Sequence, residues 1–169
     1  MIIGLTGGIA TGKSTAAEYL KKKGAKIIDA DQISHKITQK GEKGWKRVID
    51  EFGKDILRED GEFDREKLGE IVFADKNKLQ LLNSIVHPLV RQEMQQIIDN
   101  AEDEILIFEI PLLFESGLER AFDFSINVSV KKQKQKERLA QRDEIASQQQ
   151  EQRINSQMSN EKKNQKADK

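Results

Sequence analysis

The residues with the clearest chemical meaning form a glycine-rich run near the start of the chain. Residues 7–14 read Gly-Gly-Ile-Ala-Thr-Gly-Lys-Ser and match the pattern G-x-x-x-x-G-K-[ST] at every fixed position. Glycines let the backbone wrap closely around phosphate oxygens, where a side chain would clash. Successive N–H groups and the start of a following helix then present positive partial charge to an anion. The run therefore predicts a nucleotide-phosphate site.

Two side chains at the end of this run have separate predicted roles in that site. Lys13 directs a full positive charge toward the β- and γ-phosphates, and the hydroxyl of Ser14 is a ligand for Mg²⁺. The predicted nucleotide contacts are Gly8, Ile9, Ala10, Thr11, Gly12, Lys13, Ser14 and Thr15.

Other parts of the chain decide which class of nucleotide-binding protein fits. A GTPase needs the guanine-reading pattern N-K-x-D, but Asn77-Lys78 is followed by Leu79-Gln80. The D-x-x-G pattern at residues 50–53 ends an amphipathic helix rather than following a strand, so helix termination explains it. Helicases and transport ATPases need far more than 169 residues. A small-molecule kinase fits best.

The elements that must position these residues alternate between strands and helices. We expect buried strands at residues 1–5, 26–28, 105–110 and 124–130, and a helix over 13–23. Asp64 is expected to cap a helix, and a further helix is expected to stop or kink where His87 precedes Pro88. This order predicts an α/β fold whose core is a mainly parallel sheet.

The long helical block between the second and third strands predicts an inserted lobe. We expect one kinase domain with its core at residues 1–40 and 101–131, a helical lobe at about 41–100 and a helical lid at about 132–160. Ligands of such sheets gather beyond the carboxyl ends of the strands. Residues 7–14, Asp31 and the segment after Ile110 are predicted to lie there.

Composition excludes several other classes. The chain has no cysteine and only two histidines, which argues against disulfides and an all-protein zinc cage. No apolar run is long enough to span a bilayer, so we expect a soluble cytoplasmic protein without a membrane partner. Residues 131–169 are basic but contain no aromatic residue to stack on bases, so we expect no nucleic-acid partner.

Five blocks in order resemble the dephospho-CoA kinase family. They are residues 5–15 around the glycine-rich run, Ile28-Asp29-Ala30-Asp31, His87-Pro88-Leu89, residues 110–117 (Ile-Pro-Leu-Leu-Phe-Glu-Ser-Gly) and residues 138–143 (Arg-Leu-Ala-Gln-Arg-Asp). The resemblance implies ATP-dependent phosphorylation of the ribose 3′-hydroxyl of dephospho-CoA, the last step of coenzyme A biosynthesis. It also implies an adenylate-kinase-like parallel sheet with a CoA-binding lobe and a lid. We expect a monomer, with weak homo-oligomerisation as the alternative.

Asp31 is the predicted catalytic carboxylate. A ribose hydroxyl is a poor nucleophile at neutral pH, so a carboxylate that accepts its proton is useful. Asp31 follows the second strand, and the resemblance favours a role as base or as a Mg²⁺-linked group. The alternative is that Asp31 caps a helix over residues 32–37, while Asp29 is the carboxylate nearer the strand end.

The remaining predicted site residues supply positive charge and acceptor contacts. Arg138 and Arg142 stand one turn apart and resemble the lid arginines that stabilise a migrating phosphoryl group; the alternative is pairing with Glu137 or Asp143. The resemblance places His87 and Arg91 near the acceptor, although a structural cap or a core hydrogen bond also explains His87. Leu112 follows an apolar strand and is expected to line the acceptor pocket, with core packing as the alternative.

Two departures keep other functions open. Family members usually continue past Ala167-Asp168 into a strand and a helix, which we expect to be missing here, and Glu109 stands where many related proteins have an aspartate. The alternatives are a kinase for another small metabolite, such as a nucleoside or sugar acid, and a non-catalytic nucleotide-binding protein.

Overall fold

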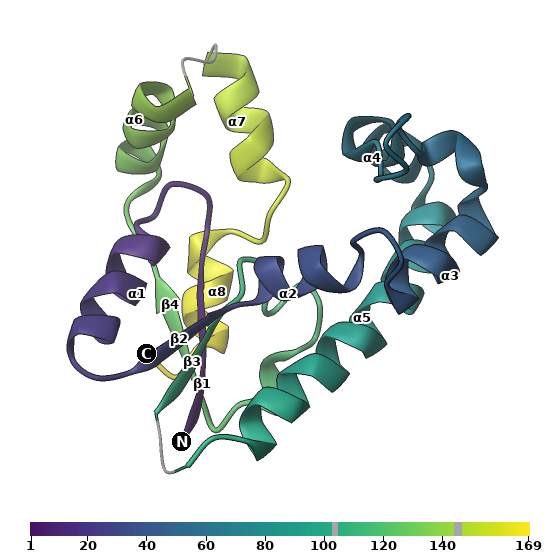
Figure 1. The fold of residues 1–169 in the computed structure, drawn as a ribbon. Helices are drawn as coiled ribbons and strands as arrows, with labels where there is room; N and C mark the ends of the chain where they lie inside the picture. Colours follow the sequence, from purple (N-terminus) through teal and green to yellow (C-terminus); the bar gives the residue numbers. More distant parts are fainter. Residues whose placement is uncertain (103–104, 144–146) are drawn as a thin grey trace. The chain divides into compact units, whose positions relative to one another are not determined.

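A computed structural model of the chain describes residues 1–102, 105–143 and 147–169 (Figure 1). These residues form two compact units, which we call unit 1 (Met1–Asp29 and Ala101–Lys169) and unit 2 (Ala30–Asn100). The lobe was expected to begin near residue 41, whereas the unit boundary lies at Ala30. The difference arises because helix α2 (Ala30–Ile37) packs along helix α5 (Lys76–Asp99), where Lys36 pairs with Glu93 at 2.7 Å.

Unit 1 contains a four-stranded parallel sheet, which confirms the predicted fold class. Its strands are β1 (Ile2–Gly7), β2 (Lys26–Asp29), β3 (Leu106–Glu109) and β4 (Phe124–Val128). Their order in the sheet is β2-β3-β1-β4, and Leu5 of β1 lies opposite Glu109 of β3 and Ile126 of β4. Because the strands are parallel, their carboxyl ends meet at one edge, which brings the end of β1 beside the end of β3.

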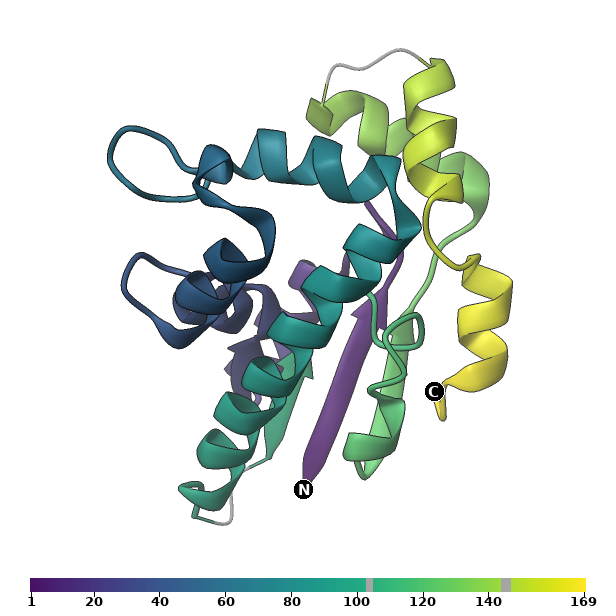
Figure 2. The ribbon, with the colours of Figure 1, turned by 90° about the vertical axis from the view of Figure 1, so that its right-hand side faces the viewer.

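Each face of this sheet is covered by a different segment of unit 1. Helix α1 (Lys13–Lys22) packs its apolar side against one face, which includes the buried Leu5. The segment after β3 runs alongside β1 (Figure 2), and the ring of Phe122 packs against that of Phe108 in a tilted arrangement, with centroids 5.6 Å apart and an interplanar angle of 54°. A Cβ on Gly4 would lie 3.0 Å from the side chain of Leu113, so glycine permits this segment to approach the strand.

The described part of unit 1 also contains the 3₁₀ helix η2 (Glu119–Ala121) and the helices α6 (Lys132–Asp143), α7 (Ser147–Asn155) and α8 (Asn160–Lys166). Helices α6 and α7 lie side by side (Figure 1). Helix α8 was not predicted from the sequence. Ser159 offers a local signal for it, because its side chain caps the helix by accepting the N–H of Lys162 at 3.4 Å. Beyond α8, Lys169 makes two backbone hydrogen bonds to β4, at 2.7 and 3.2 Å.

Unit 2 is helical and has its own apolar core. It comprises α2, α3 (Lys43–Phe52), the 3₁₀ helix η1 (Lys54–Ile56), α4 (Arg65–Ala74) and α5. The predicted cap of α4 is confirmed, since Asp64 accepts the N–H of Lys67 at 3.0 Å. The buried core residues are Val48, Ile56, Phe63, Leu68, Val72 and Ile85.

Of the two predicted outcomes at His87-Pro88, a stop or a kink, the stop is wrong, because α5 is one helix of 24 residues with Pro88 inside it. Proline has no N–H, and a proline in a helix interior costs about 3 kcal/mol. Buried apolar residues lie on both sides of it, including Ile85, Leu89 and Val90. We conclude that their packing outweighs the local cost of the proline. In the described parts of the chain, no helix combines the length and apolar character needed to cross a membrane.

Candidate active site

The glycine-rich loop joins the end of β1 to the start of α1, the strand–loop–helix context that its sequence predicts. Gly7 ends the strand, and Lys13 is the first helical residue. Gly12 caps the helix with φ +101°, a left-handed conformation that favours glycine. Ala10 is also left-handed, with φ +57°. The loop therefore turns sharply at Ala10 and Gly12, just before α1 begins.

A cavity of about 1080 Å³ opens at this loop, entirely within unit 1. All eight residues predicted to contact the nucleotide line it, together with both predicted lid arginines. The lining residues outside the loop are Ala16, Tyr19, Pro111, Val128, Ser129, Val130, Arg138, Arg142 and Gln157. The cavity thus brings backbone donors and positive side chains to one place.

Lys13, Ser14 and Glu109 meet at the carboxyl edge of the sheet. The ammonium of Lys13 forms an ion pair with Oε1 of Glu109, and both side chains are largely buried. The hydroxyl of Ser14 donates a hydrogen bond to the same oxygen at 3.0 Å. Glu109 was not among the site residues predicted from the sequence. The signal that could have found it is an acid at the end of an apolar parallel strand next to β1.

The geometry of the loop fits a bound triphosphate with a divalent cation. A Cβ on Gly7 would lie 2.7 Å from the carbonyl oxygen of Val128, so the backbone approaches its neighbours more closely than a side chain permits. The hydroxyl of Ser14 and the carboxylate of Glu109 supply hard oxygen atoms, the ligand type that Mg²⁺ prefers. Lys13 lies beside these oxygens as a counter-charge for phosphate.

The two predicted lid arginines have different partners in this structure. Arg138 donates through Nη1 to the carbonyl oxygen of Thr11 at 2.9 Å and so contacts the phosphate loop directly. Arg142 instead donates to both oxygens of Asp143, at 2.6 and 2.9 Å, which is the alternative that the sequence left open. Arg153 of α7 contacts Asp143 as well, at 2.7 Å. Hydrogen bonding to Arg142 lowers the pKa of the Asp143 carboxyl and keeps it ionised.

Three of the residues predicted to contact the acceptor belong to unit 2: Asp31, His87 and Arg91. Asp31 is exposed in the first turn of α2 and follows the first helical residue, Ala30, so it does not precede the helix as a cap would. His87 and Arg91 lie one turn apart on α5, the helix against which α2 packs. Leu112 belongs to unit 1 and is 44% exposed in the segment after β3.

The environment of His87 predicts a pH-dependent stability. Burial, and secondarily the charge of Arg91, lower the pKa of His87 below its usual 6.5, so the folded chain binds this proton less readily than the unfolded chain. Stability from this group is therefore complete above pH 6.5 and is lost as the pH falls through the lowered pKa. We expect His87→Gln to flatten the decline of the thermal midpoint between about pH 7 and 5. His35→Gln, at an exposed site on α2, is the control, and an unchanged slope in His87→Gln would contradict the prediction.

Comparison with known proteins relates this chain to one family. A sequence model of the family described as dephospho-CoA kinase matches residues 1–169. A dephospho-CoA kinase of Lactobacillus johnsonii is 45% identical over 159 residues, which cover 92% of this chain and 80% of that protein. A dephospho-CoA kinase of Fusobacterium nucleatum is 45% identical over 168 residues, which cover 99% of this chain and 86% of the relative.

Solved structures show a similar fold. A crystal structure of the Thermus thermophilus protein TT1252 superposes with a TM-score of 0.85 at 31% sequence identity, covering 99% of this chain and 85% of the other. A structure titled as a dephospho-CoA kinase from Campylobacter jejuni has a TM-score of 0.69 at 35% identity, with the same coverage.

Proposed function

The chain belongs to the dephospho-CoA kinase family and accordingly catalyses the last step of coenzyme A biosynthesis, and we propose how its residues carry out that step. The reaction transfers the γ-phosphoryl group of ATP to the ribose 3′-hydroxyl of dephospho-CoA. One observation carries the proposal: Lys13, Ser14 and Glu109 meet beside a glycine loop that lines a cavity of about 1080 Å³. This arrangement supports binding of a triphosphate with its terminal group near a positive charge.

The phosphate loop is proposed to bind ATP. Residues Gly8–Thr15 supply backbone N–H groups, and Lys13 leaves Glu109 to bind the β- and γ-phosphates. Mg²⁺ would be held by the hydroxyl of Ser14 and would neutralise charge on the phosphates when bound. Glu109 then keeps a carboxylate beside Ser14, where it can orient the hydroxyl toward the ion.

Unit 2 is proposed to bind dephospho-CoA and to supply the base. Asp31 accepts the proton of the 3′-hydroxyl as that oxygen attacks the γ-phosphorus. His87 and Arg91 are proposed to contact the ribose or a phosphate of the acceptor. The lowered pKa of His87 supports a neutral imidazole that donates or accepts a hydrogen bond without adding charge. Leu112 of unit 1 is proposed to line the acceptor pocket.

Helix α6 is proposed to act as part of the lid and to stabilise the transferring group. Arg138 already contacts the loop through Thr11, and Arg142 lines the same cavity while it pairs with Asp143. Phosphoryl transfer places negative charge on equatorial oxygens, which a guanidinium can bind through two N–H groups. We assign both arginines to this role.

The wider setting of the reaction is also a proposal. Unit 1 is proposed to serve as nucleotide-binding core and lid, and unit 2 as the acceptor lobe. We propose a monomer that acts on small molecules in the cytoplasm, without nucleic-acid or membrane partners. The sequence has no cysteine and so forms no disulfide that an oxidising compartment would stabilise, which supports this location.

A panel of acceptors tests the function. Purified protein is mixed with ATP, Mg²⁺ and one acceptor at a time, and ADP release is followed by a coupled assay. We expect rapid release with dephospho-CoA and background release with nucleosides, sugar acids and other alcohols. Release driven by another acceptor would assign a different metabolite kinase, and nucleotide binding without release would assign a non-catalytic binding protein.

A further inference from the structure

Two glutamines from outside the phosphate loop hold the Ile9 backbone from both sides. The N–H of Ile9 donates to Oε1 of Gln157 at 2.8 Å, and the carbonyl oxygen of Ile9 accepts from Nε2 of Gln135 at 2.6 Å. These partners are 148 and 126 residues away in the sequence. Gln135 lies on α6, one turn before Arg138, whereas Gln157 lies in the connection between α7 and α8. The two contacts fix both polar backbone groups of one loop residue.

The loop needs such support because of its next residue. Ala10 is left-handed with φ +57°, although it has a side chain. A left-handed residue other than glycine costs about 1–2 kcal/mol, and such conformations persist where surrounding contacts over-determine them. Ala10 lies between two held residues. Ile9 before it contacts Gln157 and Gln135, and Thr11 after it accepts a hydrogen bond from Arg138. Their geometry maintains the turn that places the following N–H groups.

A buried charge lies close to the segment that carries Gln157. Lys163 of α8 is fully buried, and it is the one ionisable side chain among the buried residues that the structure describes. Its ammonium lies 3.0 Å from Glu115 and donates to the carbonyl oxygen of Pro111 at 2.8 Å. A buried charge needs such partners, since an unpaired one is strongly destabilising. Lys163 therefore ties α8 to the segment after β3.

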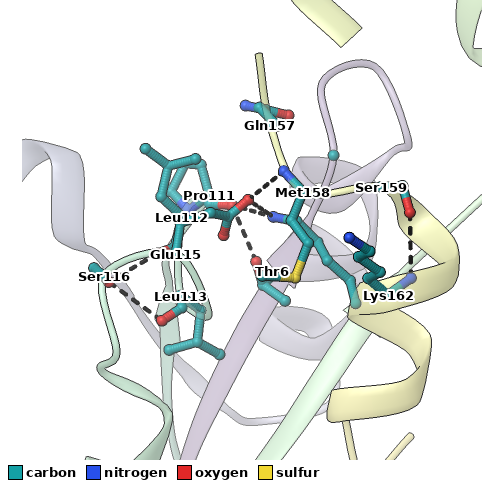
Figure 3. A network of polar contacts seen from close by, with 12 residues as sticks. Thr6, Pro111, Leu112, Leu113, Glu115, Ser116, Gln157, Met158, Ser159 and Lys162 are labelled. Atoms are coloured by element: carbon teal, nitrogen blue, oxygen red, sulfur yellow. Dashed lines mark hydrogen bonds and ion pairs between the residues drawn. The ribbon is translucent and has the colours of Figure 1, made fainter. Parts of the chain in front are cut away.

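The same carboxylate reaches the residue next to Gln157. Glu115 accepts the backbone N–H of Met158 at 2.9 Å, and Figure 3 shows its side chain directed at that nitrogen. The carbonyl oxygen of Pro111 also accepts the hydroxyl of Thr6 at 3.1 Å, which connects the network to β1 just before the phosphate loop. Continuous contacts thus run from Lys163 through Glu115 and Met158 to Gln157 and Ile9.

We propose that Gln157 is a positioning residue for ATP binding, and that the buried Lys163–Glu115 pair sets its place against the phosphate loop. The inference deepens the proposed function, because it rests on the assignment of this loop to ATP. Gln157 acts through the Ile9 backbone and the turn at Ala10. Loss of its carbonyl oxygen therefore weakens the nucleotide complex and leaves acceptor binding unchanged.

The first test replaces Gln157 with leucine, which keeps the bulk and removes the hydrogen-bond acceptor. We expect KM for ATP to rise about tenfold, as the loss of one ordinary hydrogen bond predicts, with KM for dephospho-CoA unchanged. Gln152→Leu, at an exposed site on α7, is the matched control and should retain both constants. An unchanged KM for ATP in Gln157→Leu, or an equal rise in both constants, would overturn the inference.

Amide hydrogen exchange tests the contact without any turnover. In the nucleotide-free protein, the Ile9 amide should exchange about tenfold faster in Gln157→Leu than in the natural chain. Gln157→Glu retains an acceptor oxygen, so slow exchange of Ile9 should return in that variant. Fast exchange in the natural chain would show that the contact is not formed in solution, and the inference would fail.

A third variant tests the link to the buried pair. Lys163→Met removes the charge and keeps most of the shape, while Glu115 is 23% exposed and can be hydrated. We expect a folded protein with a raised KM for ATP, and a Lys163→Met/Gln157→Leu double variant no worse than Gln157→Leu alone. If KM for ATP in the double variant rises by the product of the two single effects, the two substitutions act independently and the link is overturned.

The outcomes separate this inference from the proposed function. If the natural chain fails to phosphorylate dephospho-CoA, the proposed function fails, whatever the Ile9 amide does. If the natural chain is active and Gln157→Leu has the same KM for ATP, the function stands and the inference fails.

Discussion

Replacing Lys13 with methionine is expected to lower kcat/KM for ATP about a thousandfold, equivalent to about 4 kcal/mol of transition-state stabilisation. Methionine keeps most of the length of the side chain but removes the charge proposed to bind the β- and γ-phosphates. The loss should fall mainly on kcat, since charge builds on the phosphoryl oxygens during transfer. Steady-state kinetics with saturating dephospho-CoA measure it.

The control for this variant is Lys22→Met, which removes a lysine from an exposed position on the same helix. It should retain natural activity. Because Lys13 pairs with the largely buried Glu109, the thermal midpoint of Lys13→Met must be recorded as well. A folded Lys13→Met protein with natural kcat/KM would exclude the proposed phosphate site.

Replacing Asp31 with asparagine is expected to lower kcat about a hundredfold or more, because an amide of the same shape cannot accept the proton of the ribose hydroxyl. Asp31 is exposed in the first turn of α2, so its substitution should change stability little. KM for ATP should also change little, since nucleotide binding is assigned to unit 1. A full kinetic analysis that varies each substrate separates these constants.

Asp29→Asn provides the comparison for Asp31→Asn. Asp29 is the last residue of β2 and lies two positions earlier in the chain. A larger loss of kcat at Asp29 would transfer the role of base to that residue. Natural kcat in both variants would contradict the proposal that either carboxylate acts as the base.

Short-range signals explain why much of unit 1 could be predicted. The strand, the glycine loop and helix α1 follow one another within residues 2–22, and each depends on neighbours in the sequence. Gly12 permits the left-handed turn because it has no side chain, and this does not depend on the rest of the fold. The order of apolar strands also predicts a parallel sheet, and with it the edge where Gly7 and Glu109 end their strands.

Proline shows the limit of such local rules. Pro88 disfavours a helix by itself, and the sequence therefore predicts that the helix stops or kinks there. Packing of apolar neighbours such as Ile85 and Leu89 overrides that preference. Whether packing outweighs the cost of a proline depends on how much apolar surface the neighbouring side chains bury, and that area is set by the folded structure.

The sequence by itself determined the phosphate loop, the parallel sheet and the family, because these depend on residue types at fixed spacing. Only the tertiary structure decided that Glu109 contacts both Lys13 and Ser14, and that Gln157 holds the Ile9 backbone from 148 residues away. A lysine at position 163 resembles any other surface lysine in a charged helix until folding buries it beside Glu115. The physical reason is that a hydrogen bond or ion pair requires proximity in space, which sequence spacing specifies only within a turn or a strand.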